Sequence, residues 1–87
     1  MYKVLISKKT EKFLDKTSRS DKNLFRQFID ALDLIAEKPY AGKPLVGNLK
    51  GYFSYRVRDY RIIYEIEDMK LLVYIEKIAH RKESYNE

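Results

Sequence analysis

The hydrophobic and polar positions along this chain follow two different periods. Between residues 21 and 38, apolar side chains recur at spacings of three and four (Leu24, Phe25, Phe28, Ile29, Leu32, Ile35 and Ala36), as on one face of an amphipathic α-helix. Ser20 or Asp21 can cap the first turn, and Pro39 disfavours helical geometry in the residue before it. The pattern therefore predicts a helix that ends at Lys38.

A shorter helix is predicted before it, over residues 8–17. Phe13 and Leu14 lie there among lysines and acids, and Ser7 is placed to cap the first turn. The run of residues 17–20, Thr-Ser-Arg-Ser, is expected to break this helix. The resulting connection of about four residues is usual between antiparallel helices.

Four segments are rich in β-branched and aromatic residues and are predicted as strands: residues 2–6, 52–58, 60–67 and 71–78. Because side chains alternate across a strand, one face is expected to receive the helices, with Phe53, Tyr55, Val57, Tyr60, Ile62, Tyr64, Leu71, Val73 and Ile75. The other face is expected to stay open to solvent or a ligand, with Arg56, Arg58, Arg61, Glu65, Tyr74 and Glu76. Residues 39–51 hold every glycine and proline and are predicted as a loop.

This order predicts an α+β fold, βααβββ, in which an N-terminal helical hairpin packs on one face of a mainly antiparallel, four-stranded twisted sheet. With 87 residues, the chain is expected to be a single domain, residues 1–87. The last residues, 80–87, are expected to form a polar tail. No apolar run is long enough for a signal peptide or a membrane span. Without cysteines there is neither a disulfide nor a thiolate site, and the protein is expected to be cytoplasmic.

The charge of the chain favours polyanionic partners. A net charge of +5 and a pI near 9.4 are suited to binding nucleic acid, an anionic membrane surface or an acidic protein. The alternative is a basic protein whose charge has no such partner. One histidine and no cysteine argue against a metal site. The glycines lack the pattern of a phosphate-binding loop, and neither Ser54 nor Ser84 has a base beside it for nucleophilic catalysis.

The arginines on the open face are the main candidates for chemistry. Guanidinium groups bind phosphate in a bidentate manner and tyrosine rings stack on unpaired bases, so this inventory suits single-stranded RNA. The alternative is that the arginines are the solvated face of a half-buried strand. Glu65 and Glu76 are expected to form salt bridges that orient the arginines rather than to act as paired catalytic acids. Lys43, Lys50, Tyr74 and Lys82 are further candidates for RNA contact.

Several motifs together resemble a known family. Tyr55-Arg-Val-Arg58, then DYRIIYEI over residues 59–66 and IAHRKESY over residues 78–85, with Leu49-Lys-Gly51 ahead of them, resemble the RelE/ParE superfamily of bacterial and archaeal toxins, most like its RelE branch. The resemblance covers nearly the whole chain. It implies the toxin of a type II toxin-antitoxin system: a ribosome-dependent endoribonuclease that uses no metal or cofactor. Such an enzyme cuts mRNA in the decoding site of the 30S/70S ribosome by attack of the substrate's 2′-hydroxyl, and thereby inhibits translation.

The resemblance also implies site residues. The family's basic pair on the second strand falls on Arg56 and Arg58, the third-strand arginine on Arg61, the arginine after the last strand on Arg81, and the C-terminal tyrosine on Tyr85. The first three would bind the scissile phosphate, Arg81 would stabilise or protonate the leaving oxygen, and Tyr85 would stack or orient. RelE itself has a lysine pair where this chain has arginines, and a guanidinium is a poor general base. His80 is therefore the first hypothesis for the base and Glu83 the second.

The implied partner is a RelB-like antitoxin that neutralises the toxin. Operator DNA would be contacted only through the antitoxin, no membrane is involved, and the free toxin is expected to be a monomer. Two other function classes stay open. The ParE branch of the superfamily poisons DNA gyrase, and the chain could instead be a non-catalytic co-repressor that only binds its antitoxin.

Overall fold

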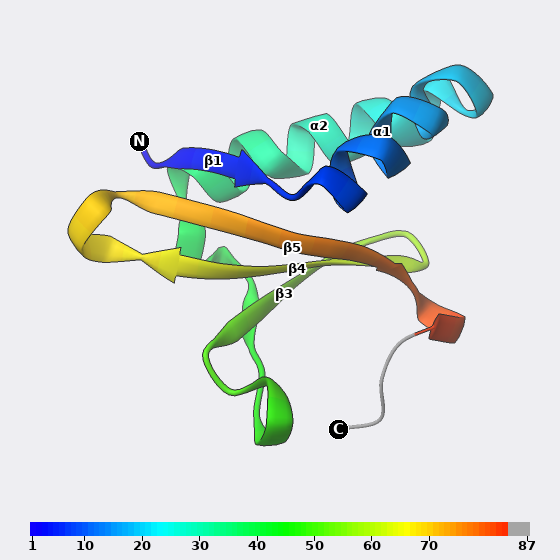
Figure 1. Cartoon of the computed structure of the whole chain (residues 1–87). Coiled ribbons are helices and arrows are strands. Elements are labelled where there is room, and N and C mark those ends of the chain that lie inside the picture. The colour runs from blue at the N-terminus through cyan, green and yellow to red at the C-terminus, as the bar shows by residue number, and fades with distance from the viewer. Residues whose placement is uncertain (84–87) are drawn as a thin grey trace.

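The computed structural model describes residues 1–83 and confirms the α+β fold. Helices α1 (Lys8–Ser20) and α2 (Lys22–Glu37) lie side by side over the sheet (Figure 1). The strands are β1 (Lys3–Ile6), β2 (Lys43–Pro44), β3 (Tyr52–Val57), β4 (Tyr60–Glu67) and β5 (Leu72–His80). Their order in space is β1-β5-β4-β3-β2, with β1 parallel to β5 and the other neighbours antiparallel. Neither helix is long and apolar enough to span a membrane, nor is any other helix within residues 1–83.

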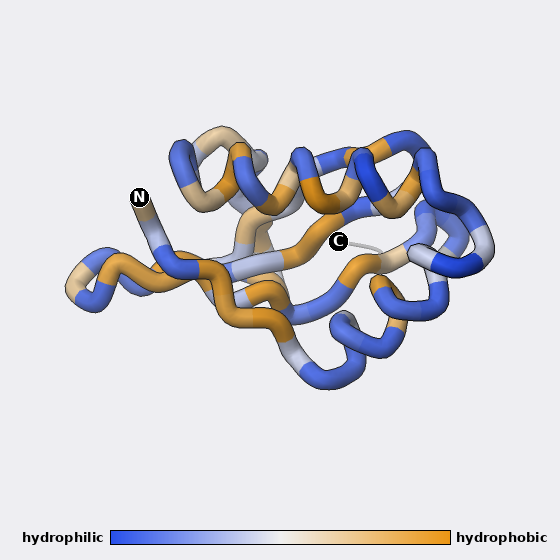
Figure 2. Tube along the Cα trace, turned by 90° about the horizontal axis from the view of Figure 1, so that it is seen from above, coloured by the Kyte–Doolittle hydropathy of each residue, from blue (hydrophilic) through white to orange (hydrophobic). Residues whose placement is uncertain are grey.

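The core lies between the two helices and one face of the sheet. Its most buried members are Phe28, Ile35, Ile62, Tyr64 and Val73. Figure 2 shows apolar and hydrophilic residues alternating around the turns of α2, as expected of a helix with one face on a sheet. The prediction of the apolar sheet face is confirmed apart from Leu71, which lies in the turn before β5 with a φ of 54° and is 54% exposed.

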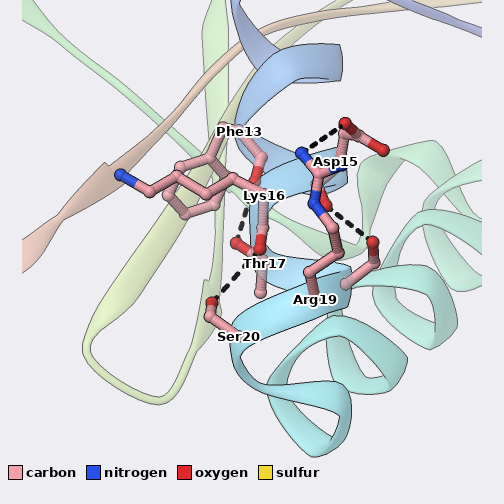
Figure 3. A network of polar contacts seen from close by, with 7 residues as sticks. Phe13, Asp15, Lys16, Thr17, Arg19 and Ser20 are labelled. Carbon is pink, nitrogen blue, oxygen red and sulfur yellow. Dashed lines mark hydrogen bonds and ion pairs between the residues drawn. The ribbon is translucent and has the colours of Figure 1, made fainter.

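The serine- and threonine-rich end of α1 continues the helix, so the predicted break was wrong. The hydroxyls of Thr17, Ser18 and Ser20 donate to the carbonyls of Phe13, Asp15 and Lys16 at 2.8, 2.6 and 3.2 Å (Figure 3). Hydroxyls that bond back to the preceding turn are satisfied inside a helix. Asp21 alone therefore separates the helices, and its carboxylate caps α2 by accepting from the N–H of Leu24 at 3.1 Å.

The other predicted helix ends are nearly correct. The Oγ of Ser7 accepts from the N–H of Thr10 at 3.2 Å, which confirms the predicted cap of α1. Helix α2 ends at Glu37, one residue earlier than predicted, and the N–H of Lys38 closes it by donating to the Leu34 carbonyl at 2.7 Å.

The segment predicted as a loop contributes a fifth strand to the sheet. In β2, Lys43 and Pro44 pair with Ser54 and Phe53 of β3. The sheet therefore has five strands rather than four, and the short β2 brings Lys43 to the edge of the open face. A strand of two residues leaves no periodic pattern, which explains why the prediction missed it.

Strand β5 contains an irregularity that changes which side chains face the helices. Ile63 pairs with Lys77 while the next residue, Tyr64, pairs with Ile75, so Glu76 is an extra residue without a partner in β4. A bulge of this kind interrupts the simple alternation of side chains. Beyond the bulge Ile78 packs in the core, and the strand runs to residue 80 rather than ending at residue 78 as predicted.

Candidate functional site

Basic side chains gather on the open face of the sheet near the β3–β4 turn. Arg56 and Arg61 are register partners, so they lie directly opposite each other on neighbouring strands. Both residues line two adjoining hollows, one of which also includes Lys43 and the other Arg81. We call the surface formed by Lys43, Arg56, Arg61 and Arg81 the basic groove.

Neither arginine of the central pair forms an ion pair within residues 1–83. The Nε of Arg56 donates to the carbonyl of Arg58 at 3.1 Å, which draws this guanidinium toward the turn. The salt bridges expected from Glu65 and Glu76 are not formed with these arginines. The two carboxylates instead raise the pKa of Tyr52, Glu65 more strongly than Glu76. Like charges that stand opposite each other repel, so the pair favours an anion bound between them.

Arg81 is brought to the basic groove by a backbone contact. It opens a short 3-10 turn after β5, and its N–H donates to the carbonyl of Asp59 at 2.6 Å. The Nη1 of Arg81 also lies 3.9 Å from Oδ1 of Asp59. Both side chains are more than half exposed, so this ion pair adds little stability. The backbone bond is the contact that holds the end of β5 against the β3–β4 turn.

Arg58 turns toward α2, so the prediction that it shares a face with Arg56 was wrong. It is the first of the two residues that join β3 to β4, with a φ of 54°, and strand alternation ends at Val57. Its Nε donates to Oε1 of Gln27 at 3.0 Å, and its Nη1 lies 3.9 Å from Oδ2 of Asp21. Arg58 therefore links the turn to the first half of α2.

His80 lines neither hollow of the basic groove. It pairs with Tyr60 across the strands, and the two rings meet edge to face with centroids 5.0 Å apart. Ala79 is the residue opposite Arg61, and neighbouring residues of a strand point to opposite faces. The Nδ1 of His80 accepts from the N–H of Lys82 at 3.1 Å. The role of His80 as general base stays a prediction that this position does not favour.

The other predicted contact residues are spread over the molecule. Lys50 precedes β3, Tyr74 lies opposite Glu65 in β5, and Lys82 follows Arg81. Unlike Lys43, these three line neither hollow of the basic groove. Tyr85 lies outside the described residues. Within residues 1–83, no three His, Cys, Asp or Glu side chains come together as a possible metal site.

A second group of shifted pKa values lies at the opposite end of the sheet. Asp68, in the β4–β5 turn, accepts hydrogen bonds from the hydroxyls of Tyr2, at 2.5 Å, and Tyr40. These bonds lower the pKa of Asp68, raise that of Tyr40 and raise the pKa of Tyr2 to about 12. Figure 1 shows this turn beside the N-terminus and far from the β3–β4 turn. The cluster therefore ties three segments of the fold together and does not belong to the basic groove.

Comparison with known proteins shows the family to which this chain belongs. A family model described as the ParE toxin of type II toxin-antitoxin system, parDE, matches residues 4–85. The chain belongs to this toxin family. The match spans nearly the whole chain, so the resemblance to the RelE/ParE superfamily is confirmed.

Individual relatives agree with the family. Toxin RelG of Mycobacterium tuberculosis is 42% identical over 53 residues, which are 61% of this chain and 61% of that relative. The matched region thus spans less than two thirds of RelG. A chain of the toxin-antitoxin complex RelBE2 from M. tuberculosis superposes with a TM-score of 0.78 at 29% identity, covering 92% of this chain and 98% of that one. The YoeB/ParE toxin from Agrobacterium tumefaciens, at 19% identity, shares the fold with a TM-score of 0.80 over 90% of this chain and 96% of its own.

Asp59 is a residue of the candidate site that the sequence prediction missed. It lines the same hollow as Arg56, Arg61 and Arg81. The sequence did contain a clue, because a two-residue turn between Arg56 and Arg61 must carry Asp59 at the tip of the same hairpin. The three guanidinium groups can bind a phosphodiester and stabilise negative charge that develops on it, and Asp59 adds a carboxylate beside them.

Proposed function

We propose that this toxin is a ribosome-dependent, metal-independent endoribonuclease that cleaves mRNA in the decoding site and thereby inhibits translation. The observation that carries the proposal is the register pairing of Arg56 with Arg61 beside Arg81. Guanidinium groups are well suited to bidentate binding of phosphate, and an opposed pair is stabilised by an anion between its members. The likeness to RelG and to a chain of the RelBE2 complex supports the RelE branch.

In the proposed reaction, the 2′-oxygen of a nucleotide attacks the adjacent phosphorus. The bond from phosphorus to the 5′-oxygen breaks, which leaves a 2′,3′-cyclic phosphate and a 5′-hydroxyl. Arg56 and Arg61 bind the non-bridging oxygens and stabilise their developing charge. Arg81 stabilises or protonates the leaving 5′-oxygen. Arg58 is not assigned to the phosphate, because Gln27 and Asp21 hold its guanidinium on the α2 side of the turn.

Residues around this centre would hold the rest of the RNA. Lys43 extends the basic groove along β2 and is assigned to a neighbouring phosphate. Lys50, Tyr74 and Lys82 are assigned to RNA or ribosome contacts farther away, and Tyr85 to stacking on a base or orienting it. Contacts from Lys43 position the substrate without taking part in bond breaking, so replacing it should weaken binding more than it slows the chemical step.

The proposed partner is a cognate RelB-like antitoxin, because a solved relative is a chain of the toxin-antitoxin complex RelBE2. We propose that the antitoxin covers the basic groove and keeps RNA out of it. The toxin would reach operator DNA only through this antitoxin, would be a monomer when free, and would act in the cytoplasm.

DNA gyrase poisoning is the second candidate function, and the description of the matching family as a ParE toxin favours it. A gyrase poison needs a surface for a protein partner and no geometry for phosphodiester cleavage. The two functions therefore differ in whether RNA is cut. Inhibition of DNA supercoiling by purified gyrase is the direct assay for the second.

The test is primer-extension mapping of an mRNA held in a programmed ribosome, with free mRNA as a control. We expect cuts in the decoding-site codon, none in free mRNA, and loss of at least about 100-fold in rate for Arg61→Ala. Arg19→Ala is the matched control, because Arg19 is an exposed arginine of α1 that pairs with Asp15 away from the groove. No cuts from the folded wild-type toxin would overturn the proposal in favour of gyrase poisoning or a purely regulatory role.

A further inference from the structure

The proposed reaction needs a group that accepts the proton of the attacking 2′-hydroxyl, and the arginines of the basic groove cannot supply it. Guanidinium groups stay protonated in proteins and have no acceptor atom. His80 contacts Tyr60, which lines this hollow, but His80 does not line the hollow itself. Among the described residues that line the hollow shared by Arg56, Arg61 and Arg81, one carries a carboxylate, and that residue is Asp59.

The β3–β4 hairpin places the carboxylate of Asp59 in the site, and no structural hydrogen bond within residues 1–83 occupies this carboxylate. Its backbone carbonyl, rather than its side chain, accepts from the N–H of Arg81. The distance of 3.9 Å from Oδ1 to Nη1 of Arg81 is too long for a hydrogen bond, and the Asp59 side chain is 63% exposed. Both carboxylate oxygens can therefore accept a hydrogen bond from a substrate.

Three of the other five aspartates are engaged in structural contacts, and the remaining two, Asp30 and Asp33, lie on α2 and do not line this hollow. Asp15 accepts from Arg19, Asp21 caps α2 by accepting from the N–H of Leu24, and Asp68 accepts from two tyrosines. Within residues 1–83, no hydrogen bond is formed by the side chain of Asp59. A carboxylate that lies in a hollow of arginines without a structural hydrogen bond is available for chemistry.

We propose that Asp59 is the general base of the cleavage reaction, an inference that rests on the proposed endoribonuclease function. The carboxylate takes the proton of the 2′-hydroxyl as the 2′-oxygen bonds to phosphorus. The bond to the 5′-oxygen breaks, Arg81 stabilises the negative charge that develops on that oxygen, and the oxygen takes a proton from water. Asp59 then releases its proton to water, so that the site returns to its starting state. Carboxylates serve as general bases when they reach the proton in the bound complex.

The first experiment compares single-turnover cleavage on programmed ribosomes at saturating toxin. We expect Asp59→Asn, which keeps the shape but loses the base, to be at least about 100-fold slower. Asp59→Glu, which keeps a carboxylate, should retain more activity than Asp59→Asn. Asp33→Asn is the matched control, because Asp33 is an exposed aspartate of α2 and the charge change is the same. Circular dichroism shows whether each variant folds. If Asp59→Asn does not fold, Asp59→Ser provides a second variant that lacks the carboxylate.

A second substrate separates a base from a residue that only positions Arg81. In this mRNA a sulfur replaces the leaving 5′-oxygen at the cut site, and a thiolate leaves without needing a proton. Arg81→Ala should be largely rescued on this substrate. Asp59→Asn should stay as slow relative to the wild type as on the oxygen substrate, because loss of the base is not repaired by a better leaving group. Rescue of both variants would overturn the proposal and make Asp59 a positioning residue.

The two levels of the proposal fail in different ways. If the wild-type toxin cuts no ribosome-bound mRNA, the endoribonuclease function is wrong and the role of Asp59 is lost with it. If the wild type cuts and Asp59→Asn cuts at the same rate, only the assignment of the base is wrong.

Discussion

Arg56 and Arg61 face each other as register partners on β3 and β4, and neither forms an ion pair within residues 1–83. Like charges that stand directly opposite on a sheet destabilise it. Arg61→Gln is therefore expected to leave the free energy of unfolding unchanged or to raise it by up to about 1 kcal/mol. The same change should reduce cleavage at least about 100-fold, because one of the two groups proposed to bind the phosphate is gone.

Urea unfolding and ribosome cleavage assays on the same preparations measure both effects. Arg19→Gln is the control, because it removes a charge from an exposed i,i+4 ion pair. It should change the free energy of unfolding and the cleavage rate only slightly. A loss of several kcal/mol in Arg61→Gln would show that Arg61 stabilises the sheet.

The backbone conformation of Arg58 predicts that a glycine at this position is more stable than an alanine. A φ of 54° is the left-handed region, which glycine adopts more readily than any residue with a Cβ. Arg58→Gly and Arg58→Ala lose the same contacts to Gln27 and Asp21, so their difference isolates the backbone conformation. We expect the glycine variant to be more stable by about 1 kcal/mol, measured by urea unfolding.

Arg56 provides the control, because it lies in the extended β3. There the order should reverse, since glycine within a strand is less favourable than alanine. If the alanine variant were more stable than the glycine variant at Arg58 as well as at Arg56, the result would contradict a left-handed turn at Arg58.

The buried hydroxyl of Tyr64 links the sheet to the segment after α2. It donates to the carbonyl of Pro39 at 2.7 Å and accepts from the N–H of Gly42 at 3.1 Å. Tyr64→Phe leaves both backbone groups unpaired and should lower the free energy of unfolding by about 1–3 kcal/mol. Gly42→Ala should cost a similar amount, about 1–3 kcal/mol, because a Cβ at this position would lie 2.3 Å from the tyrosine oxygen.

The double variant tests whether the two residues act through the same contact. Removing the hydroxyl also removes the atom that the new Cβ meets most closely, so the combined loss should be clearly smaller than the sum of the single losses. Additive losses, measured by denaturant unfolding of the four proteins, would argue against this contact.

The cluster of Asp68 with Tyr2 and Tyr40 predicts how stability depends on pH. The hydrogen bonds from the two tyrosines hold the pKa of Asp68 below its ordinary value of 3.8. Their contribution to stability is therefore present above that pH and is lost as the pH falls through the lowered pKa. The hydrogen bond to Asp68 also raises the pKa of Tyr2 from 10.0 to about 12, so this contribution is lost as the pH rises through that interval.

The measurement is the urea midpoint of the wild type and of Asp68→Asn over a range of pH. The difference in urea midpoint should be largest near neutral pH and should shrink at both extremes. Asp33→Asn, at an exposed position of α2, controls for the charge change. A difference that stays constant from acid to alkaline pH would rule out ionisation of this cluster as its cause.

The apolar pattern predicted the helices, the four longer strands and the buried sheet face from the sequence alone. Phe28 and Ile35 lie on the predicted stripe of α2, and Ile62 and Tyr64 on the predicted face of β4. Burial on one side of a regular element imposes a local period, and a local period can be read without knowing the partner. The family resemblance was likewise visible in short motifs, and the family comparison confirmed it.

The errors occur where the regular period is interrupted. The hydroxyls at the end of α1 bond back into the helix rather than breaking it. Arg58 leaves the strand pattern at a left-handed turn, and an extra residue at Glu76 disturbs the alternation before His80. Bulges and turn conformations depend on how one strand pairs with the next, which composition and spacing do not specify.

For the candidate site, too, the sequence predicted one part and the tertiary structure decided the other. The sequence by itself determined that Arg56 and Arg61 would lie on the open face of the sheet, because the hydrophobic period assigns the opposite face to the core. Only the tertiary structure decided which groups share one hollow: it paired Arg56 with Arg61, brought Arg81 across to Asp59, and turned Arg58 toward α2. The physical reason is that a period sets the face on which a side chain lies, whereas strand register and turn geometry set its neighbours.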